Sequence, residues 1–304
     1  MMFRWTVALL LLLLAACGGG AKQTVVENPY AEKMKELSRN GVAAMQKERW
    51  KIAETSFDRA LQAAQLANDP ALIARAWYNL GMLHVSAGEL EKGAVTLKQA
   101  EVIALQHGLT VSQARSQIAL ALLNQRRGVA AWQPEVLSST MPVDLHLSAA
   151  RLAQLQGRGD VAYQEYGFVL KNAGNERSGL FYKIEAHMGL ALMAEQKQDH
   201  KTAKKEAALV LKMSREIGAP RVAAHALLLQ ASLTQDVAEK RDDLQDALVI
   251  YRALQDLHGQ SDSLHQLMHL AEQQGDPVEL ERLQGELDQV GEGMMHAQGF
   301  DKRD

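Results

Sequence analysis

Turn-forming residues punctuate this chain at nearly even intervals, and the segments between them are rich in helix-forming residues. Between about residue 33 and residue 290, one set of these marks recurs with a period near 40 residues, and a second set divides each period in two. Glycine favours the left-handed position after a helix, and proline favours the first turn of the next helix. The sequence therefore predicts consecutive helical hairpins. The first set is Asn68-Asp69-Pro70, His107-Gly108, Gly174, Gly218-Ala219-Pro220 and His258-Gly259; the second is Gly88-Glu89, Gly128, Gly159-Asp160, Gln198-Asp199 and Gly275-Asp276-Pro277.

The composition supports a large helical body and excludes several classes of protein. Of the 304 residues, 47% are apolar and 5% are aromatic, which is unlike a disordered or an all-β chain. A single cysteine excludes an internal disulfide and any cysteine-rich metal site. A formal net charge of -3 provides no basic field for nucleic acid.

Small and apolar residues recur at helical spacing inside the hairpins. The second hairpin carries Trp77, Leu80 and Gly81 on its first helix, and Gly93 and Leu97 on its second. This pattern resembles the tetratricopeptide repeat (TPR), in which small residues let neighbouring helices approach closely. The resemblance implies an all-α, right-handed superhelical solenoid of about seven TPR-like hairpins with long, roughly 40-residue repeats. The consensus glycine position falls at Gly41, Gly81, Ala121, Leu152, Ala191, Ser232 and Met268.

The third repeat is irregular. After Gly128 the chain carries Trp132, Pro134 and Pro142 where a second helix is expected. We expect a shortened or broken helix there and a seam between repeats one to three and four to seven, near residues 128–142. The solenoid is expected to span residues 34–290. The tail at residues 291–304 has three glycines and no apolar stripe, so we expect it to be disordered.

The N-terminal sequence predicts where in the cell the protein is located. Residues 1–16 combine Arg4 with an apolar run that is too short to span a bilayer but suits a signal peptide. The run ends in Leu14-Ala15-Ala16-Cys17, which resembles the lipobox of bacterial lipoproteins. The resemblance implies removal of residues 1–16, a lipid such as palmitate on Cys17, and a flexible tether over residues 17–33. Gly18, where a retention signal would have Asp, implies the outer membrane of a Gram-negative bacterium, with the protein facing the periplasm.

The TPR resemblance also implies where a ligand would bind, because TPR ligands usually lie along the concave surface formed by the first helices. Arginines suit carboxylates, while tyrosine, methionine and aliphatic side chains supply apolar contact, so we expect a peptide ligand. Three arginines on neighbouring first helices would form a basic stripe that favours an acidic segment. By this resemblance, the residues expected on the concave surface are Arg75, Tyr78, Asn79, Met82, Arg115, Ile118, Leu122 and Arg126, with Lys35, Ser38 and Val42 beside them.

Catalytic signatures are missing from the sequence. It has no Gly-x-Ser-x-Gly elbow, no phosphate-binding Gly-x4-Gly-Lys-Ser/Thr loop and no His-Glu-x-x-His motif. We therefore expect no enzyme activity and no cofactor. One set of four polar residues leaves a metal site as an alternative. Its members lie on one face of a helix, and two imidazoles one turn apart can bind a divalent ion. That group is Asp262, His265, His269 and Glu272.

These observations favour a lipid-anchored periplasmic adaptor or scaffold that binds another envelope protein through its concave groove. The machinery it would serve is that of pilus or secretion assembly, outer-membrane assembly or peptidoglycan metabolism. Two alternatives stay open: a metal-assisted hydrolase centred on His265 and His269, and a self-associating structural component of the envelope.

Overall fold

The described part of the chain is helical throughout. A computed structural model describes residues 28–129, 132–133 and 135–300, and in these ranges it has 13 helices and no strand. The predicted signal peptide, Cys17 and most of the predicted tether lie outside the described residues. The chain divides into two compact units, residues 1–108 and 109–304, which are described separately below. The all-α prediction is confirmed.

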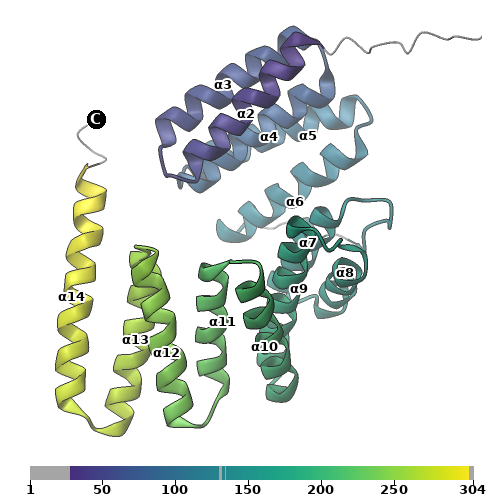
Figure 1. Ribbon diagram of the computed structural model, residues 1–304. Helices are drawn as coiled ribbons and strands as arrows, with labels where there is room; N and C mark the ends of the chain where they lie inside the picture. The colour runs from purple at the N-terminus through teal and green to yellow at the C-terminus, as the bar shows by residue number, and fades with distance from the viewer. Residues whose placement is uncertain (1–27, 130–131, 134, 301–304) are drawn as a thin grey trace, which may run out of the picture. The chain divides into compact units, whose positions relative to one another are not determined.

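The first unit consists of two helical hairpins (Figure 1). Helix α2 pairs with α3, α4 pairs with α5, and α3 also packs on α4 to join the two hairpins. The helices are α2 (Pro29–Met45), α3 (Trp50–Ala67), α4 (Pro70–Ser86) and α5 (Leu90–Gln106).

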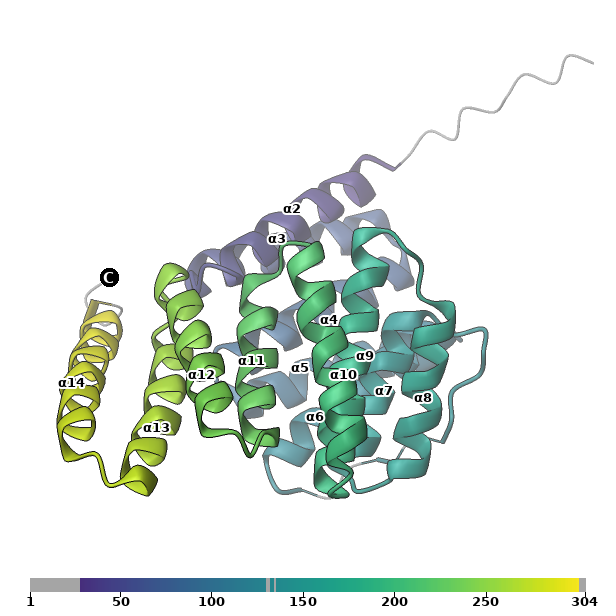
Figure 2. The ribbon, with the colours of Figure 1, turned by 60° about the horizontal axis from the view of Figure 1, so that its bottom comes forward.

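The second unit begins with a single helix and continues with four hairpins (Figure 2). Helix α6 packs on α7, and the hairpins α7/α8, α9/α10, α11/α12 and α13/α14 follow in order. Between α6 and α7 the described residues contain no helix, where we expected a shortened or broken one. The helices are α6 (Thr110–Arg126), α7 (Val143–Leu155), α8 (Gly159–Asn172), α9 (Arg177–Gln196), α10 (His200–Glu216), α11 (Pro220–Leu233), α12 (Val237–Ala253), α13 (Leu257–Gln274) and α14 (Pro277–Phe300).

Left-handed residues end many of these helices. Glycine adopts this conformation without steric cost, which explains most of the turn positions read from the sequence. Some of the following helices start on a side-chain cap, as at Asp69, whose carboxylate accepts from the Ala71 amide at 2.8 Å. Helices α3, α5, α6, α8 and α11 start without one. The left-handed residues within hairpins and after α6 are Glu48, Gly88, Gly128, Gly157, Gln198 and Gly275, and those between hairpins are Asn68, Gly108, Gly218 and Gln255.

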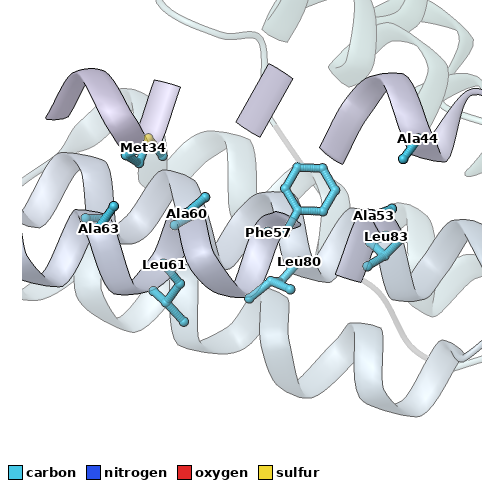
Figure 3. Close-up of a cluster of buried hydrophobic side chains, with 11 residues drawn as sticks. Met34, Ala44, Ala53, Phe57, Ala60, Leu61, Ala63, Leu80 and Leu83 are labelled. Atoms are coloured by element: carbon cyan, nitrogen blue, oxygen red, sulfur yellow. The ribbon is translucent and has the colours of Figure 1, made fainter. Parts of the chain in front are cut away.

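Small residues let the paired helices approach closely. In the first unit, a Cβ atom on Gly41 would lie 2.6 Å from the Phe57 ring, and one on Gly81 would lie 2.6 Å from Leu97 Cγ. Ala53 is fully buried in the same core (Figure 3). The structure therefore confirms close helix contacts at Gly41 and Gly81, where a larger side chain would overpack the interface.

Both predicted boundaries of the helical body require correction. Helix α2 begins at Pro29 and not at residue 34, because the Asn28 side chain accepts from the Tyr30 amide at 2.9 Å and caps the helix. Helix α14 continues to Phe300, so residues 291–300 are helical where we expected disorder. Val290 and Met294 pack on the last core cluster, and this burial offsets the poor helix propensity of nearby glycines.

The register of the fourth repeat and the position of the seam were also wrong. Gly157 is the left-handed residue of the α7/α8 turn, and Gly159 already belongs to α8. The position equivalent to Gly41 and Gly81 is therefore Ala150 and not Leu152. The break between compact units follows Gly108, since α6 packs on α7. The irregular segment near 128–142 lies inside the second unit.

The expected turn at His258-Gly259 is in fact the first turn of α13. Gly259 is a helical residue that faces the buried ring of Tyr251, where a methyl group would overlap the ring. The turn lies earlier, at Gln255, which adopts the left-handed conformation with φ of 54°. Asp256 caps α13 by accepting from the Gly259 amide at 3.1 Å. A glycine needed for close packing was thus interpreted as a glycine needed for a turn.

Candidate protein-binding surfaces

The candidate residues of the first unit lie on the first helices α2 and α4. Arg75 is exposed, while Tyr78 and Met82 are half-buried. Asn79 donates from Nδ2 to Oγ of the buried Ser38 on α2, at 3.4 Å. This contact ties α4 to α2, so Asn79 has a structural role beside any role in binding.

The candidate residues of the second unit lie on α6. Arg126 is exposed and Arg115 is partly exposed, whereas Ile118 is only 1% exposed. Ile118 packs in the core between α6 and α7, and half-buried Leu122 packs against the same core. The prediction that Ile118 contacts a ligand is therefore wrong, because its side chain is buried between α6 and α7.

Ion pairs connect the first helices of the second unit. Arg115 on α6 pairs with Asp144 on α7, Nη1 to Oδ2 at 2.6 Å. Two turns further along α7, Arg151 pairs with Glu185 on α9. Farther along, Ser232 on α11 donates to Glu195 on α9 at 3.0 Å. The sequence predicted the arginine at 115 but did not predict these acidic partners.

The acidic partners change the electrostatics expected for this surface. The side chains of Arg115 and Asp144 are 35% and 30% exposed, and those of Arg151 and Glu185 are 49% and 34% exposed. Ion pairs at this exposure contribute about 0–1 kcal/mol each. An arginine has five N–H donors, so one carboxylate partner does not saturate it. The surface is therefore a row of alternating charges that a ligand carboxylate can join, and not the simple basic stripe that we expected.

A buried histidine–glutamate pair joins α7 to α8 in the same unit. Glu165 on α8 is 0% exposed and His146 on α7 is 1% exposed. His146 Nδ1 donates to Oε2 of Glu165, and its ring stacks on Phe168 with ring centroids 3.7 Å apart. The other carboxylate oxygen accepts from the Leu137 amide at 2.6 Å. Polar side chains at this depth are costly unless they are hydrogen-bonded, and here they bond to each other and, through Glu165, to the backbone.

A second pair of the same kind follows in the next hairpin. His187 on α9 bonds through Nδ1 to Oε2 of Glu206 on α10 at 2.5 Å. In both pairs the histidine precedes the glutamate by 19 residues. The two pairs are offset by 41 residues, which is the repeat length in this part of the chain. Sequence reasoning missed both pairs, although this recurring spacing is a signal that could have revealed them.

The irregular segment after α6 is fastened to the second unit at several points. Glu165 holds the Leu137 amide, and Gln156 donates to the Trp132 carbonyl at 3.0 Å. The Leu137 and Met141 side chains pack on the core between α6 and α7. Trp132 itself is 43% exposed. Its ring is thus accessible on a segment whose backbone is held by the repeats around it.

The proposed metal-binding residues do not form a cluster. Asp262, His265, His269 and Glu272 are all exposed on α13. Across the residues that the structure describes, no three or more His, Cys, Asp or Glu side chains converge as metal ligands. No third ligand from another element closes on His265 and His269, so the geometry gives no support to the metal-assisted hydrolase.

Among the helices of the described ranges, none is both long enough and apolar enough to cross a bilayer. This finding concerns the described residues only and leaves the N-terminal apolar run untested.

Comparisons with known proteins identify the fold. No protein-family model and no curated protein matches this chain. The apo form of RapI is a similar solved structure, with a TM-score of 0.51 and 9% identity over 90% of this chain and 88% of RapI. BtubC from P. vanneervenii matches with a TM-score of 0.46 and 14% identity over 88% of this chain and 93% of BtubC. A tetratricopeptide repeat protein from Parabacteroides merdae gives a TM-score of 0.36 and 14% identity, over 85% of this chain and 99% of that one.

The similarity to RapI, together with the consecutive hairpins, confirms the predicted TPR-like helical-repeat fold. Identities this low define the fold and not the function.

Proposed function

We propose that this chain is a non-enzymatic adaptor that is anchored by lipid at the outer membrane and binds a protein partner of the envelope through its first helices. The row formed by Arg115, Asp144, Arg151 and Glu185 carries the proposal. These charges are partly exposed, lie on consecutive first helices and sit on a scaffold with a packed core. Such a surface suits an extended peptide with acidic side chains, because arginines offer directional hydrogen bonds to carboxylates.

The lipid anchor is supported by the sequence Leu14-Ala15-Ala16-Cys17 after the apolar run. Cys17→Ala should abolish acylation and release the protein from the membrane fraction. Metabolic labelling with a fatty-acid probe measures the first effect, and fractionation measures the second. Acyl labelling that persists in the variant would show that another residue carries the lipid.

The binding surface is tested by reversing charge in the row. The double variant Arg115→Glu, Arg151→Glu should lose the proteins that the wild-type chain recovers from detergent-solubilised envelope. Helix content and melting temperature should change little, since exposed substitutions usually alter stability by less than about 0.5 kcal/mol. Arg75→Glu and Arg126→Glu extend the test to the other exposed arginines.

The matched control is Arg252→Glu. Arg252 is also an exposed arginine in an ion pair between helices, but it joins α12 to Glu286 on α14, both second helices. The control should recover the same proteins as the wild-type chain. Equal recovery by the double variant and the control would place the ligand surface elsewhere, and substitutions at Trp132 would be the next test.

A further inference from the structure

One end of the first unit gathers the start of α2 and the ends of α3 and α5 (Figure 1). Asn28 Nδ2, at the start of α2, donates to the carbonyl oxygen of Ala67, the last residue of α3, at 3.3 Å. Helix α4 begins at Pro70, so it starts at the same end. Because α5 packs on α4 as the second helix of a hairpin, α5 ends where α4 begins. We call this the tether-side end, since the chain enters it at Asn28 from the predicted tether.

Three large apolar side chains are exposed at the tether-side end. Tyr30 on α2 is 46% exposed, Leu66 on α3 is 63% exposed and Leu105 on α5 is 61% exposed. The eight residues 64–71 carry one charged side chain, which caps α4, and the eight residues 102–109 carry none apart from a histidine. Covering this end would therefore bury apolar surface while removing little charge from water.

The opposite end of the first unit differs in its charge. It too has exposed apolar side chains, because Ile52 on α3 is 55% exposed and Val95 on α5 is 65% exposed. However, the eight residues 47–54 carry five charged side chains, and the eight residues 89–96 carry three. An apolar phase in front of this end would remove water from those charges, which is costly. The two ends of the same helices therefore differ in what can cover them.

The predicted lipid anchor would hold the tether-side end near a bilayer. Residues 17–27, eleven in number, begin with Cys17 and directly precede Asn28. Even a fully extended chain of this length spans at most about 40 Å. Such a short connection gives the attached unit a high effective concentration at the bilayer surface. A few exposed apolar side chains can therefore dock there, although on their own they would bind a membrane only weakly.

We propose that the tether-side end docks onto the phospholipid surface of the bilayer that carries the anchor, with Tyr30, Leu66 and Leu105 in the interfacial region. Tyrosine suits this region because its ring is apolar and its hydroxyl is polar, and leucine adds apolar area. The proposal rests on the proposed lipid anchor at Cys17. It specifies which end of the first unit faces the membrane, and it keeps the charged opposite end in water.

The test is fluorescence quenching of the full acylated chain in vesicles of phosphatidylethanolamine and phosphatidylglycerol. The sequence has one cysteine, and acylation blocks its thiol, so an introduced cysteine provides a single free thiol for a fluorophore. One chain carries Gln65→Cys at the tether-side end, and another carries Lys51→Cys toward the opposite end of α3. Both positions are exposed. They lie 14 residues, or roughly 21 Å, apart along the same helix.

Some of the vesicle lipids carry a nitroxide quencher on the acyl chain. A docked face reaches about 5–10 Å into the boundary between headgroups and acyl chains, so we expect quenching at position 65 to exceed quenching at position 51 by at least about threefold. The difference should persist from about 20 mM to about 500 mM salt, because salt screens charges and not apolar contacts. Equal quenching at both positions, on chains that float with the vesicles, overturns the docking and leaves the anchor intact. Chains that do not float overturn the anchor and the docking together.

Two matched double variants identify the side chains responsible. Leu66→Gln with Leu105→Gln should lower quenching at position 65 to the level at position 51, while flotation with the vesicles stays unchanged. Ile52→Gln with Val95→Gln removes exposed apolar side chains from the opposite ends of the same two helices, and it should leave quenching at position 65 unchanged. All four side chains are exposed, so both variants should keep wild-type helix content. If the two double variants give equal quenching at position 65, the leucines do not hold this end on the bilayer and the proposal is wrong.

Discussion

Gly189 on α9 offers a sharp test of how closely the helices of the second unit approach. A Cβ atom at this position would lie 2.6 Å from Tyr166 Cε2, and closer still to the end of the ring. Tyr166 is 1% exposed and donates to Gln154 Oε1 at 2.7 Å, so the ring cannot move away freely. Gly189→Ala should therefore lower stability even though alanine is the better helix former.

The magnitude follows from two opposing effects. Replacing glycine by alanine inside a helix gains about 1 kcal/mol from propensity. Overpacking a core contact costs about 1–3 kcal/mol. The matched control is Gly167→Ala on α8, because Gly167 is an exposed helical glycine with nothing within 4 Å of its virtual Cβ. The control should gain only the stability that comes from helix propensity. The free energies of unfolding of the two variants should therefore differ by about 1–3 kcal/mol.

Thermal unfolding followed by circular dichroism measures the difference. For a folding unit of about 150–250 residues, 1 kcal/mol shifts the melting temperature by about 2–4 °C. The Gly189→Ala chain should thus melt about 2–12 °C below the Gly167→Ala chain. Adding Tyr166→Leu to Gly189→Ala should reduce the penalty in a double-mutant cycle. Equal gains in melting temperature from both glycine substitutions would refute the close contact.

Three other predictions follow from the packing and the charges. Gly81→Leu and Ala53→Phe should each lower the melting temperature through overpacking of roughly 1–3 kcal/mol or more, and wild-type melting in both would refute the register of the first unit. His146→Leu or Glu165→Leu alone should cost roughly 1–3 kcal/mol or more in urea unfolding, whereas the double substitution should cost less than the sum of the two, because neither side chain is left buried without its partner. Burial and the neighbouring carboxylates raise the pKa of Asp243 on α12 to about 6, so its contribution to stability is fully present below about pH 4 and is lost as the pH rises through 6. Asp243→Asn should therefore stabilise the protein at pH 7.5 but not at pH 4, and an equal effect at both pH values would contradict this.

The sequence was sufficient to predict the hairpins but not every turn. Gly88 and Gly275 were identified because glycine is the usual residue in a left-handed turn, and both adopt it. Glu48 and Gln255 adopt the same conformation without being glycine, so no local signal marked their turns. Gly259 gave the opposite error, because it was predicted to form a turn but lies inside α13 against Tyr251. A glycine that allows close packing looks the same in sequence as one that allows a turn.

The candidate site was less predictable because it depends on pairs of distant residues. Arg115 could be placed on a first helix from its spacing, but its partner Asp144 comes from the next repeat after an irregular segment of unpredictable length. Ile118 lies three residues before Ala121, and the equivalent residues Ser38 and Leu147 of two regular hairpins are also buried. The burial of this position depends on the packing of successive repeats, which the sequence of one helix does not show. Local pattern sets the face of a helix, whereas its neighbours decide what that face contacts.

The irregular segment also explains why a histidine–glutamate pair lies in the core of the second unit. Without a second helix, an irregular segment must cover α6, and its backbone cannot satisfy its own hydrogen bonds as a helix would. The Leu137 amide is one such group, and Glu165 accepts its hydrogen bond. A buried carboxylate in turn needs a donor, which His146 supplies. His146 Nε2 is a buried nitrogen without a hydrogen-bond partner in the part of the chain that the structure describes, and the imidazole ring stacks on Phe168. We therefore interpret the His146–Glu165 pair as the contact that holds the irregular segment against α8. The next repeat has no such segment, and its pair is less buried, with His187 and Glu206 side chains 18% and 13% exposed.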